Sequence, residues 1–304
     1  MQPLPASQRL VRRHAQSADG TTIAYYVGGA GPDAPALVVA GGLAGHHGVW
    51  RHQLAYLGDR FRFLTWDYRG LYRSEAPRPA GARFGITAQL DDLRAVTEAA
   101  GLERFSLLGW SVGVQIAAEA FHALPGRVES LVMICGTAGR PLDVATGHRR
   151  WRRAWIGERL RRTVRTTARA PGLLNRASRS WLGRRALAQT LRGFGLLGPT
   201  VGDEVLAEIV EGLDEVDVES YAETLYALAG HDATAVLASI DVPALVLAGG
   251  QDPFAPAALA HQLARQLPCS EVLIVPSGRH FLFLEYPELV NLRLERFFQD
   301  VGLC

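Results

Sequence analysis

The residues best suited to chemistry lie in one short stretch of the chain, Gly-Trp-Ser-Val-Gly at positions 109–113. An apolar run with Leu107 and Leu108 precedes it and predicts a buried strand, and residues 114–120 predict the start of a helix. A serine with a glycine two residues to either side, at a strand-to-helix junction, is typical of a nucleophile elbow. Glycine is required because side chains at these positions would collide with the backbone of so tight a turn. We therefore expect the hydroxyl of Ser111 to project from the carboxyl edge of a sheet as a nucleophile.

The pattern alone leaves a second interpretation open, a turn that merely contains serine, because such residues can occur by chance in a chain with 32 glycines. A catalytic serine also needs a neighbouring base, since its hydroxyl is a poor nucleophile at its ordinary pKa. The elements that would position the serine and supply the base must come from the rest of the chain.

Short apolar runs alternate with helical patterns along most of the chain. Residues 21–27 follow an Asp-Gly turn and predict the second strand of a hairpin that begins near Leu10. Further runs predict helices at 88–100 and 287–299, and strands at 36–40, 61–66, 131–135, 244–248 and 272–275. Continuous apolar strands that alternate with helices indicate a mostly parallel, doubly wound α/β sheet covered on both faces.

The alternation of strands stops between Gly136 and about Ile240. Apolar residues recur there at near-helical spacing, at Trp151, Trp155, Leu160 and Val164, at Val205, Ile209 and Leu213, and at Tyr221 and Leu225. Because this segment lies between two strands whose carboxyl ends should frame the active site, we interpret it as a helical cap. The predicted organisation is a core of residues 1–138 and 239–304, with the cap inserted at 139–238.

The order of these motifs resembles the α/β-hydrolase family over essentially the whole chain. Gly41-Gly42-Leu43 resembles the family's His-Gly-x oxyanion loop, and residues 67–74 resemble its Asp-x-Arg-Gly-x-Gly-x-Ser motif, with Tyr72 at the second glycine. The nucleophile elbow comes third. Residues 249–252 and 278–280 then follow two late strands, where the family keeps its acid and its histidine. The cap matches no pattern of the family.

The resemblance implies a catalytic triad. His280 would take the proton of Ser111 and later protonate the leaving group, while Asp252 would fix the tautomer of the histidine and stabilise its charged form. Each assignment has a structural alternative, because His280 could cap a loop and Asp252 could be the N-cap of the helix that follows it. A rival position for the acid, after the strand that ends at Cys135, offers no carboxylate before Asp143.

The resemblance also implies an oxyanion hole, made by the backbone N–H groups of Leu43 and Val112. Trp110 and Gly42, beside these groups in the sequence, are expected to contact the substrate. A serine at the elbow argues against the dehalogenase and epoxide-hydrolase branches of the family, which use aspartate at that position.

Other polar side chains near the predicted site have simpler interpretations. Asp67 and Arg69 are expected to be structural. His46 and His47 are expected to be solvated in the oxyanion loop, although they could line the pocket. Glu285 is expected to help start the helix that follows it and not to act as a second base.

The composition is that of an ordinary soluble enzyme, with 304 residues, 48% of them hydrophobic and 20% charged, and a net charge of +2. Apart from histidine, every basic residue is arginine, which excludes lysine Schiff-base chemistry. The three cysteines are scattered without metal-ligand spacing, so we expect the reduced cytoplasm, and neither a metal nor a cofactor is implied. The chain shows no pattern of a secretory signal and no apolar run long enough to span a bilayer.

The predicted cap carries a strong asymmetry of charge. Fourteen arginines and one acid, Glu158, lie between Arg149 and Arg192, and eight acidic residues lie between Asp203 and Glu219. In one interpretation the two halves pair with each other or with the body of the protein. In the other, the arginines bind an anionic partner such as CoA, a carrier-protein phosphopantetheine, an acidic substrate or an anionic lipid surface. No aromatic-basic motif supports nucleic acid as the partner.

The sequence therefore predicts a serine hydrolase that cleaves a carboxylic ester of a small or medium-sized molecule through an acyl-enzyme. An acyl thioesterase or acyltransferase acting on CoA or carrier-protein thioesters is the nearest alternative, because it would combine the same triad with a basic cap. A non-catalytic binding protein of the same fold is a further alternative, although such proteins usually lack one or more catalytic side chains.

Overall fold

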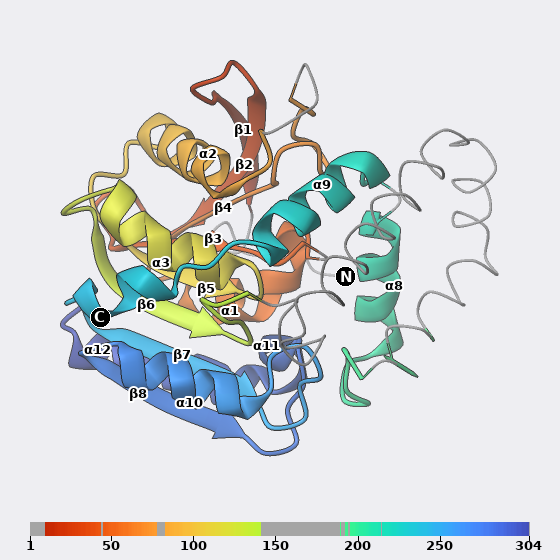
Figure 1. Cartoon of the computed structure of the whole chain (residues 1–304), viewed down its shortest axis with the longest axis vertical. Coiled ribbons are helices and arrows are strands. Elements are labelled where there is room, and N and C mark those ends of the chain that lie inside the picture. The colour runs from red at the N-terminus through yellow and green to blue at the C-terminus, as the bar shows by residue number, and fades with distance from the viewer. Residues whose placement is uncertain are drawn as a thin grey trace.

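The computed structural model describes residues 10–43, 45–77, 83–140, 189, 192–193, 195–213 and 215–303, whose arrangement is drawn in Figure 1. The strands are β1 (Val11–Gln16), β2 (Thr22–Gly29), β3 (Ala36–Ala40), β4 (Arg62–Trp66), β5 (Phe105–Trp110), β6 (Val128–Ile134), β7 (Ala244–Gly249) and β8 (Ser270–Val275). The helices are η2 (His47–Trp50), α1 (Arg51–Leu57), α2 (Ile86–Ala99), α3 (Gly113–Ala123), α8 (Asp203–Leu213), α9 (Val218–Ala229), η3 (Thr234–Ser239), α10 (Ala257–Gln266), α11 (Leu282–Glu285) and α12 (Pro287–Asp300).

The described strands form one eight-stranded sheet in the order β1-β2-β4-β3-β5-β6-β7-β8. β2 pairs in antiparallel fashion with β1 and with β4, and the remaining neighbours pair in parallel. The prediction of a mostly parallel sheet that begins with a hairpin is confirmed. β5, which leads into Ser111, lies between β3 and β6, so the loops that follow three neighbouring strands meet at one edge of the sheet.

The central strands of the sheet, such as β3, β5 and β7, are buried on both faces. Successive side chains of each strand point to opposite sides and therefore enter two separate cores. In β3, Val38 packs into the core that contains apolar residues of α2, α3 and α10. Leu37 and Val39 pack into a second core with residues of α1 and α12. Figure 1 shows α2, α3 and α10 in front of the sheet and α12 behind it. The continuous apolar runs of the sequence therefore reflect strands that are covered on both sides.

Two helices that fall within the predicted cap, α8 and α9, are among the described residues and lie at the right of the sheet in Figure 1. Val205 and Ile209 lie in α8, and Tyr221 and Leu225 lie in α9, in agreement with their helical spacing in the sequence. The tryptophans at 151 and 155 and the arginines from 149 to 185 lie outside the described residues. The boundaries of the cap at 139–238 therefore stay a prediction.

Acidic residues of the cap segment pair with the body of the protein. Glu208 of α8 pairs with Arg51 at the start of α1, and Glu215 pairs with Arg73 at 2.5 Å. These ion pairs are substantially exposed, so each contributes at most about 1 kcal/mol to stability. Pairing with the body is thus observed for these two acids, as one interpretation of the charge asymmetry requires.

Candidate active site

Ser111 occupies the sharp turn between β5 and α3. Its φ of 58° lies in the left-handed region, which costs a residue with a side chain about 1–2 kcal/mol. The flanking glycines have a steric cause, because a Cβ on Gly109 would lie 2.4 Å from the carbonyl oxygen of Gly113, and a Cβ on Gly113 would lie 2.0 Å from that of Ala40. Gly136, after β6, is constrained in the same way, since its Cβ would lie 2.4 Å from the carbonyl oxygen of Ser111. Close backbone contacts therefore impose the glycine spacing around the serine.

The structure brings the three predicted triad side chains together. Asp252 lies in the loop after β7, and His280 lies in the loop after β8. Nε2 of His280 is 3.0 Å from Oγ of Ser111, and Nδ1 of His280 is 2.9 Å from Oδ2 of Asp252. Because the carboxylate only accepts hydrogen bonds, Nδ1 carries the proton of the neutral ring and Nε2 faces the serine hydroxyl as an acceptor. The arrangement can move a proton from Oγ to Nε2.

Asp252 is 4% exposed, and both of its oxygens have partners. Oδ2 faces His280, while Oδ1 accepts hydrogen bonds from the backbone N–H groups of Phe254 at 2.8 Å and Ala255 at 3.0 Å. Burial raises the pKa of Asp252, but the hydrogen bond and charge of His280 and the two backbone N–H groups outweigh burial, so the pKa lies below its usual value. One oxygen thus fixes the loop after β7, and the other faces the histidine. Asp252 is not the N-cap of α10, because that position is Pro256.

The backbone of the His280 loop is held by two buried side chains from neighbouring strands. The indole Nε1 of Trp110 donates a hydrogen bond to the carbonyl oxygen of His280 at 2.9 Å, and Sγ of Cys135 donates to the carbonyl oxygen of Arg279 at 3.4 Å. Trp110 is 1% exposed, and its ring packs against Phe281 with the ring centroids 4.6 Å apart. This burial does not fit the expected contact of Trp110 with substrate, because the ring lies in the core and supports the histidine loop.

The loop after β3 passes next to Ser111. A Cβ on Gly42 would lie 3.2 Å from Cβ of Ser111 and 2.9 Å from the ring of Trp110, so only glycine lets the backbone come this close. Leu43 follows and is buried. Neither its N–H group nor that of Val112, at the start of α3, donates a backbone hydrogen bond to any residue in the described part of the chain.

Phe254 lies beside His280 and was not anticipated from the sequence. The centroids of the two rings are 5.5 Å apart, and Phe254 is 51% exposed. A large apolar ring that is open to solvent next to the histidine can contact a group that the histidine protonates. The only signal in the sequence was its place two residues after Asp252, because an aromatic residue in a loop belongs to no periodic pattern.

The two histidines predicted to be solvated are packed instead, so that prediction is wrong. Nδ1 of His46 accepts a hydrogen bond from the N–H of Gly48 at 2.9 Å, and the His46 side chain is 13% exposed. The ring of His47 stacks on Tyr26 with the centroids 3.8 Å apart. Burial lowers the pKa of His47 to about 4, so this ring is neutral at pH 7.

The prediction that Glu285 helps to start a helix is also wrong. Its side chain is buried, with Oε1 accepting a hydrogen bond from the N–H of Gly198 and Oε2 accepting one from the N–H of Arg279, each at 3.0 Å. Burial raises the pKa of Glu285, although both N–H groups and the charge of Arg279 act in the opposite direction. Local sequence patterns could not show this role, because Gly198 is 87 residues away.

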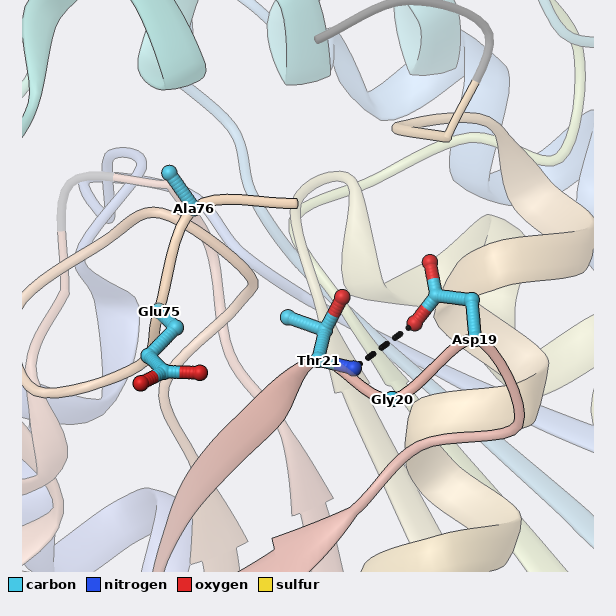
Figure 2. Close-up of a pocket in the computed structure, with 5 residues that line it drawn as sticks. All are labelled: Asp19, Gly20, Thr21, Glu75 and Ala76. Atoms are coloured by element: carbon cyan, nitrogen blue, oxygen red, sulfur yellow. Dashed lines mark hydrogen bonds between the residues drawn. The ribbon is translucent and has the colours of Figure 1, made fainter. Parts of the chain in front are cut away.

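Arg69 lies in a buried network that agrees with a structural role. Its guanidinium, 1% exposed, donates to both carboxylate oxygens of Asp92 at 2.9 and 2.5 Å and to Asp19 at 2.9 Å. Figure 2 shows Asp19 in the turn before β2, where it accepts a hydrogen bond from the N–H of Thr21 at 3.0 Å and lines a polar pocket with Glu75. The triad residues are not among the described residues that line this pocket.

Within the described ranges, no group of three or more histidine, cysteine, aspartate or glutamate side chains is arranged to hold a metal ion. None of the helices in the described part of the chain is both long and apolar enough to cross a membrane. Cys135 and Cys269 are free cysteines.

Comparison with known proteins places the chain in a family. The family described as "alpha/beta hydrolase fold" matches residues 35–287. A protein of Agrobacterium fabrum named "Putative carbamate hydrolase RutD" is 28% identical over 273 residues, which cover 87% of this chain and 93% of that protein. A pimeloyl-[acyl-carrier protein] methyl ester esterase of Nitrosomonas europaea is 28% identical over 267 residues, covering 86% of this chain and 93% of the esterase.

Among solved structures, an enol-lactonase from Burkholderia xenovorans LB400 superposes with a TM-score of 0.75 at 23% identity, over 94% of this chain and all of the lactonase. At that identity the likeness concerns the fold. Together with the family match, it confirms the resemblance drawn from the sequence motifs. The chain belongs to the α/β-hydrolase fold family and is a hydrolase.

Proposed function

We propose that the protein is a serine hydrolase that cleaves a carboxylic ester of a small or medium-sized molecule through an acyl-enzyme. Ser111 is the nucleophile, His280 the base and Asp252 the acid. The observation that carries this proposal is the unbroken series of contacts from Oγ of the serine through both ring nitrogens of the histidine to the carboxylate, at 3.0 and 2.9 Å. The names of the two relatives, a carbamate hydrolase and a methyl ester esterase, also describe acyl transfer to water.

In the first half-reaction, Nε2 of His280 takes the serine proton as Oγ bonds to the ester carbonyl carbon. The carbonyl oxygen becomes negative and accepts hydrogen bonds from the N–H groups of Leu43 and Val112, each of which is worth about 3–4 kcal/mol to the transition state. The charged histidine is stabilised by Asp252, whose lowered pKa keeps it ionised. The carbon–oxygen bond to the alcohol then breaks as the Nε2 proton passes to the departing oxygen.

In the second half-reaction, water replaces the alcohol. Nε2 of His280 takes a proton from water as its oxygen bonds to the acyl carbon, and the same two N–H groups hold the oxyanion. The bond to Ser111 breaks, Oγ recovers the proton from the histidine, and the carboxylic acid leaves. A carbamate ester would follow the same steps through a carbamoyl-enzyme.

The proposal is tested with a fluorophosphonate and a substrate panel. We expect the reagent to label Ser111, and we expect Ser111→Ala to abolish labelling and turnover while leaving the thermal unfolding midpoint close to that of the wild type. The panel consists of short and long p-nitrophenyl esters, an aryl carbamate, lactones and acyl-CoAs. An adduct mapped to any other residue, or full activity of the alanine variant, contradicts the mechanism.

A second candidate is an ester or thioester hydrolase whose acyl group is attached to an anionic carrier. The arginines between Arg149 and Arg192 and the name of the Nitrosomonas europaea relative favour it. Internal pairing accounts for part of the charge, because Arg192 pairs with Asp203 at 2.8 Å. Glu208 and Glu215 pair with Arg51 and Arg73 of the body. Activity on a carrier-bound acyl chain that greatly exceeds activity on its simple ester would support this candidate.

A further inference from the structure

Glu285 connects two parts of the chain that are far apart in sequence. It is 6% exposed, and each of its oxygens accepts one backbone hydrogen bond of 3.0 Å. The donor to Oε1 is the N–H of Gly198, which lies in the segment between β6 and β7 that the sequence predicts to be the cap. The donor to Oε2 is the N–H of Arg279, the residue directly before His280.

At position 198, only glycine leaves room for the carboxylate of Glu285. A Cβ on Gly198 would lie 2.7 Å from Oε2 and 2.9 Å from Cδ of Glu285, so a side chain at 198 would displace the carboxylate. The neighbouring residues Leu197 and Val201 are 1% and 2% exposed and belong to the same apolar core as Leu284. Residues 197–201 are therefore fixed next to the carboxylate of Glu285 by close packing as well as by a hydrogen bond.

The Arg279 side acts on the backbone that carries the histidine. Glu285 accepts a hydrogen bond from the N–H of Arg279, and Cys135 donates one to the carbonyl oxygen of Arg279. Trp110 donates one to the carbonyl oxygen of His280. Hydrogen bonds weaken steeply as their angles depart from linearity, so a small movement of this backbone would degrade both contacts of the imidazole ring. A misplacement of about 1 Å can cost about 100-fold in rate.

We propose that Glu285 is a positioning residue, which couples the seating of the cap segment at Gly198 to the placement of the His280 ring. This role rests on the proposed function, because Glu285 would act through His280, the base of that reaction. Ionised glutamate suits this task, since both oxygens must accept hydrogen bonds and a neutral side chain would turn a donor toward one of the two N–H groups.

The test perturbs the connection from each end. Glu285→Gln keeps the size of the side chain but places an amide nitrogen against one of the N–H donors. Gly198→Ala changes no residue of the His280 loop and pushes a methyl group toward Oε2 of Glu285, the oxygen that accepts the hydrogen bond from Arg279. Gly202→Ala is the matched control, because a Cβ there would meet no atom within 4 Å. Each variant is assayed for kcat, KM and the pH dependence of kcat/KM on a p-nitrophenyl ester, and for its unfolding midpoint.

We expect Glu285→Gln and Gly198→Ala to lower kcat by about 10-fold to 100-fold with little change in KM, and to shift the acidic limb of the pH profile, which reports the base. Gly202→Ala should match the wild type. A purely structural role would instead lower the unfolding midpoint and leave kcat per folded molecule and the pH profile unchanged. That result overturns the proposal, and so does a normal kcat for Gly198→Ala.

A readout without substrate separates this inference from the proposed function. We expect the Nδ1 proton between His280 and Asp252 to give a low-field proton NMR signal that is independent of turnover. We expect the signal to shift or broaden in Glu285→Gln and Gly198→Ala but not in Gly202→Ala. If the wild type hydrolyses no member of the panel, the proposed function fails, while the NMR comparison still decides whether Glu285 positions the ring. An unchanged signal in both variants contradicts the coupling.

Discussion

The two carboxylate oxygens of Asp252 have different partners, the backbone of its own loop and the ring of His280. Oδ1 accepts two backbone hydrogen bonds that fix the carboxylate, and Oδ2 is left to face Nδ1 of His280. The backbone bonds leave the carboxylate plane little freedom to rotate, so the histidine meets an acceptor that is already in place. This arrangement minimises the rearrangement needed when the ring becomes charged.

Asp252→Asn should separate the role of this oxygen from the fold. The amide nitrogen at the Oδ2 position would donate to the ring, force the proton of the neutral imidazole onto Nε2 and leave Ser111 without an acceptor. We expect a loss of about 10⁴-fold in kcat, measured on a p-nitrophenyl ester. Asp143→Asn should be nearly silent, and the reverse pattern would move the acid to the earlier strand.

The same substitution should change the pH dependence of stability. The fold lowers the pKa of Asp252 below its usual value of 3.8, so the ionised form stabilises the protein above that pH, and this contribution disappears as the pH falls through the lowered pKa. The deficit in unfolding free energy of Asp252→Asn should therefore be largest near pH 6 and should narrow below about pH 4. Urea titrations at several pH values measure it, and a deficit independent of pH would contradict the assignment.

Phe254 should affect the selectivity of the enzyme for the alcohol part of the substrate and not for the acyl part. In the proposed mechanism the histidine protonates the leaving alcohol, and the half-exposed ring of Phe254 lies beside that histidine. Phe254→Ala should lower kcat/KM for a naphthyl ester about 10-fold while changing that of the methyl ester of the same acid little, since burial of an aromatic group is worth about 1.5–3 kcal/mol when complete. Hydrolysis of the common acyl-enzyme should be unchanged, and equal losses for both esters would exclude this role.

The residues that the sequence could identify are those whose function depends on local geometry. Ser111 was marked by its glycines and its strand-to-helix junction, and the family resemblance then directed attention to the histidine and the aspartate. Glu285 and Phe254 carried no such mark, because their contacts come from segments distant in the chain or from an unpatterned loop. A single sequence does not show which distant residues come into contact in the folded chain.

At the level of elements, the turn around Ser111 depends on backbone contacts between three neighbouring strand ends. Gly113 approaches the carbonyl oxygen of Ala40 so closely that any side chain must move the end of β3. Ala40 is followed by the loop that contains Gly42 and Leu43, so a shift there would reach the groups proposed to bind the oxyanion.

Gly113→Ala should therefore lower both stability and activity. Overpacking of this kind typically costs about 1–3 kcal/mol in unfolding free energy, and we expect kcat to fall further than the loss of folded protein explains. Gly31→Ala is the matched control, because a Cβ at that exposed loop position would meet no atom within 4 Å. Urea denaturation and kcat per folded molecule measure the two effects, and similar behaviour of both variants would contradict the steric argument.

The strands were predictable because burial on both faces leaves continuous apolar runs. β3 has the predicted bounds, and the ends of β4 and β7 differ from prediction by one residue. The short elements η2, α1 and α11 were not predicted, because 4 to 7 residues are too few to establish a helical period.

For the molecule as a whole, the distribution of charge distinguishes the two candidate functions. If the arginines between Arg149 and Arg192 receive an anionic carrier, kcat/KM for an acyl-CoA should fall with added salt, because the Debye length shortens from about 10 Å at 0.1 M to about 3 Å at 1 M. A neutral ester of the same acyl chain should lose far less. Neutralising Arg161, Arg162 and Arg165 together should reproduce the effect of salt on the acyl-CoA alone.

Equal responses of the two substrates, accompanied by a lower unfolding midpoint of the triple variant, would instead identify the arginines as internal pairing partners. The sequence located the helices α8 and α9 by their spacing but could not identify the partners of the acids in α8 and in the loop that follows it. Glu208 and Glu215 pair with Arg51 and Arg73, two arginines of the body that no local pattern connects to them.

The proposed triad residues are far apart in the chain, so they are made at different times during translation. Ser111 leaves the ribosome 169 residues before His280, which corresponds to roughly 10–30 s at about 5–20 residues per second. During that interval the proposed base of the serine has not been made, and β7 and β8, which precede the aspartate and the histidine, are made only near its end. With the proposed triad, the growing chain is expected to carry an unreactive serine hydroxyl until β8 has joined the sheet and His280 has followed it.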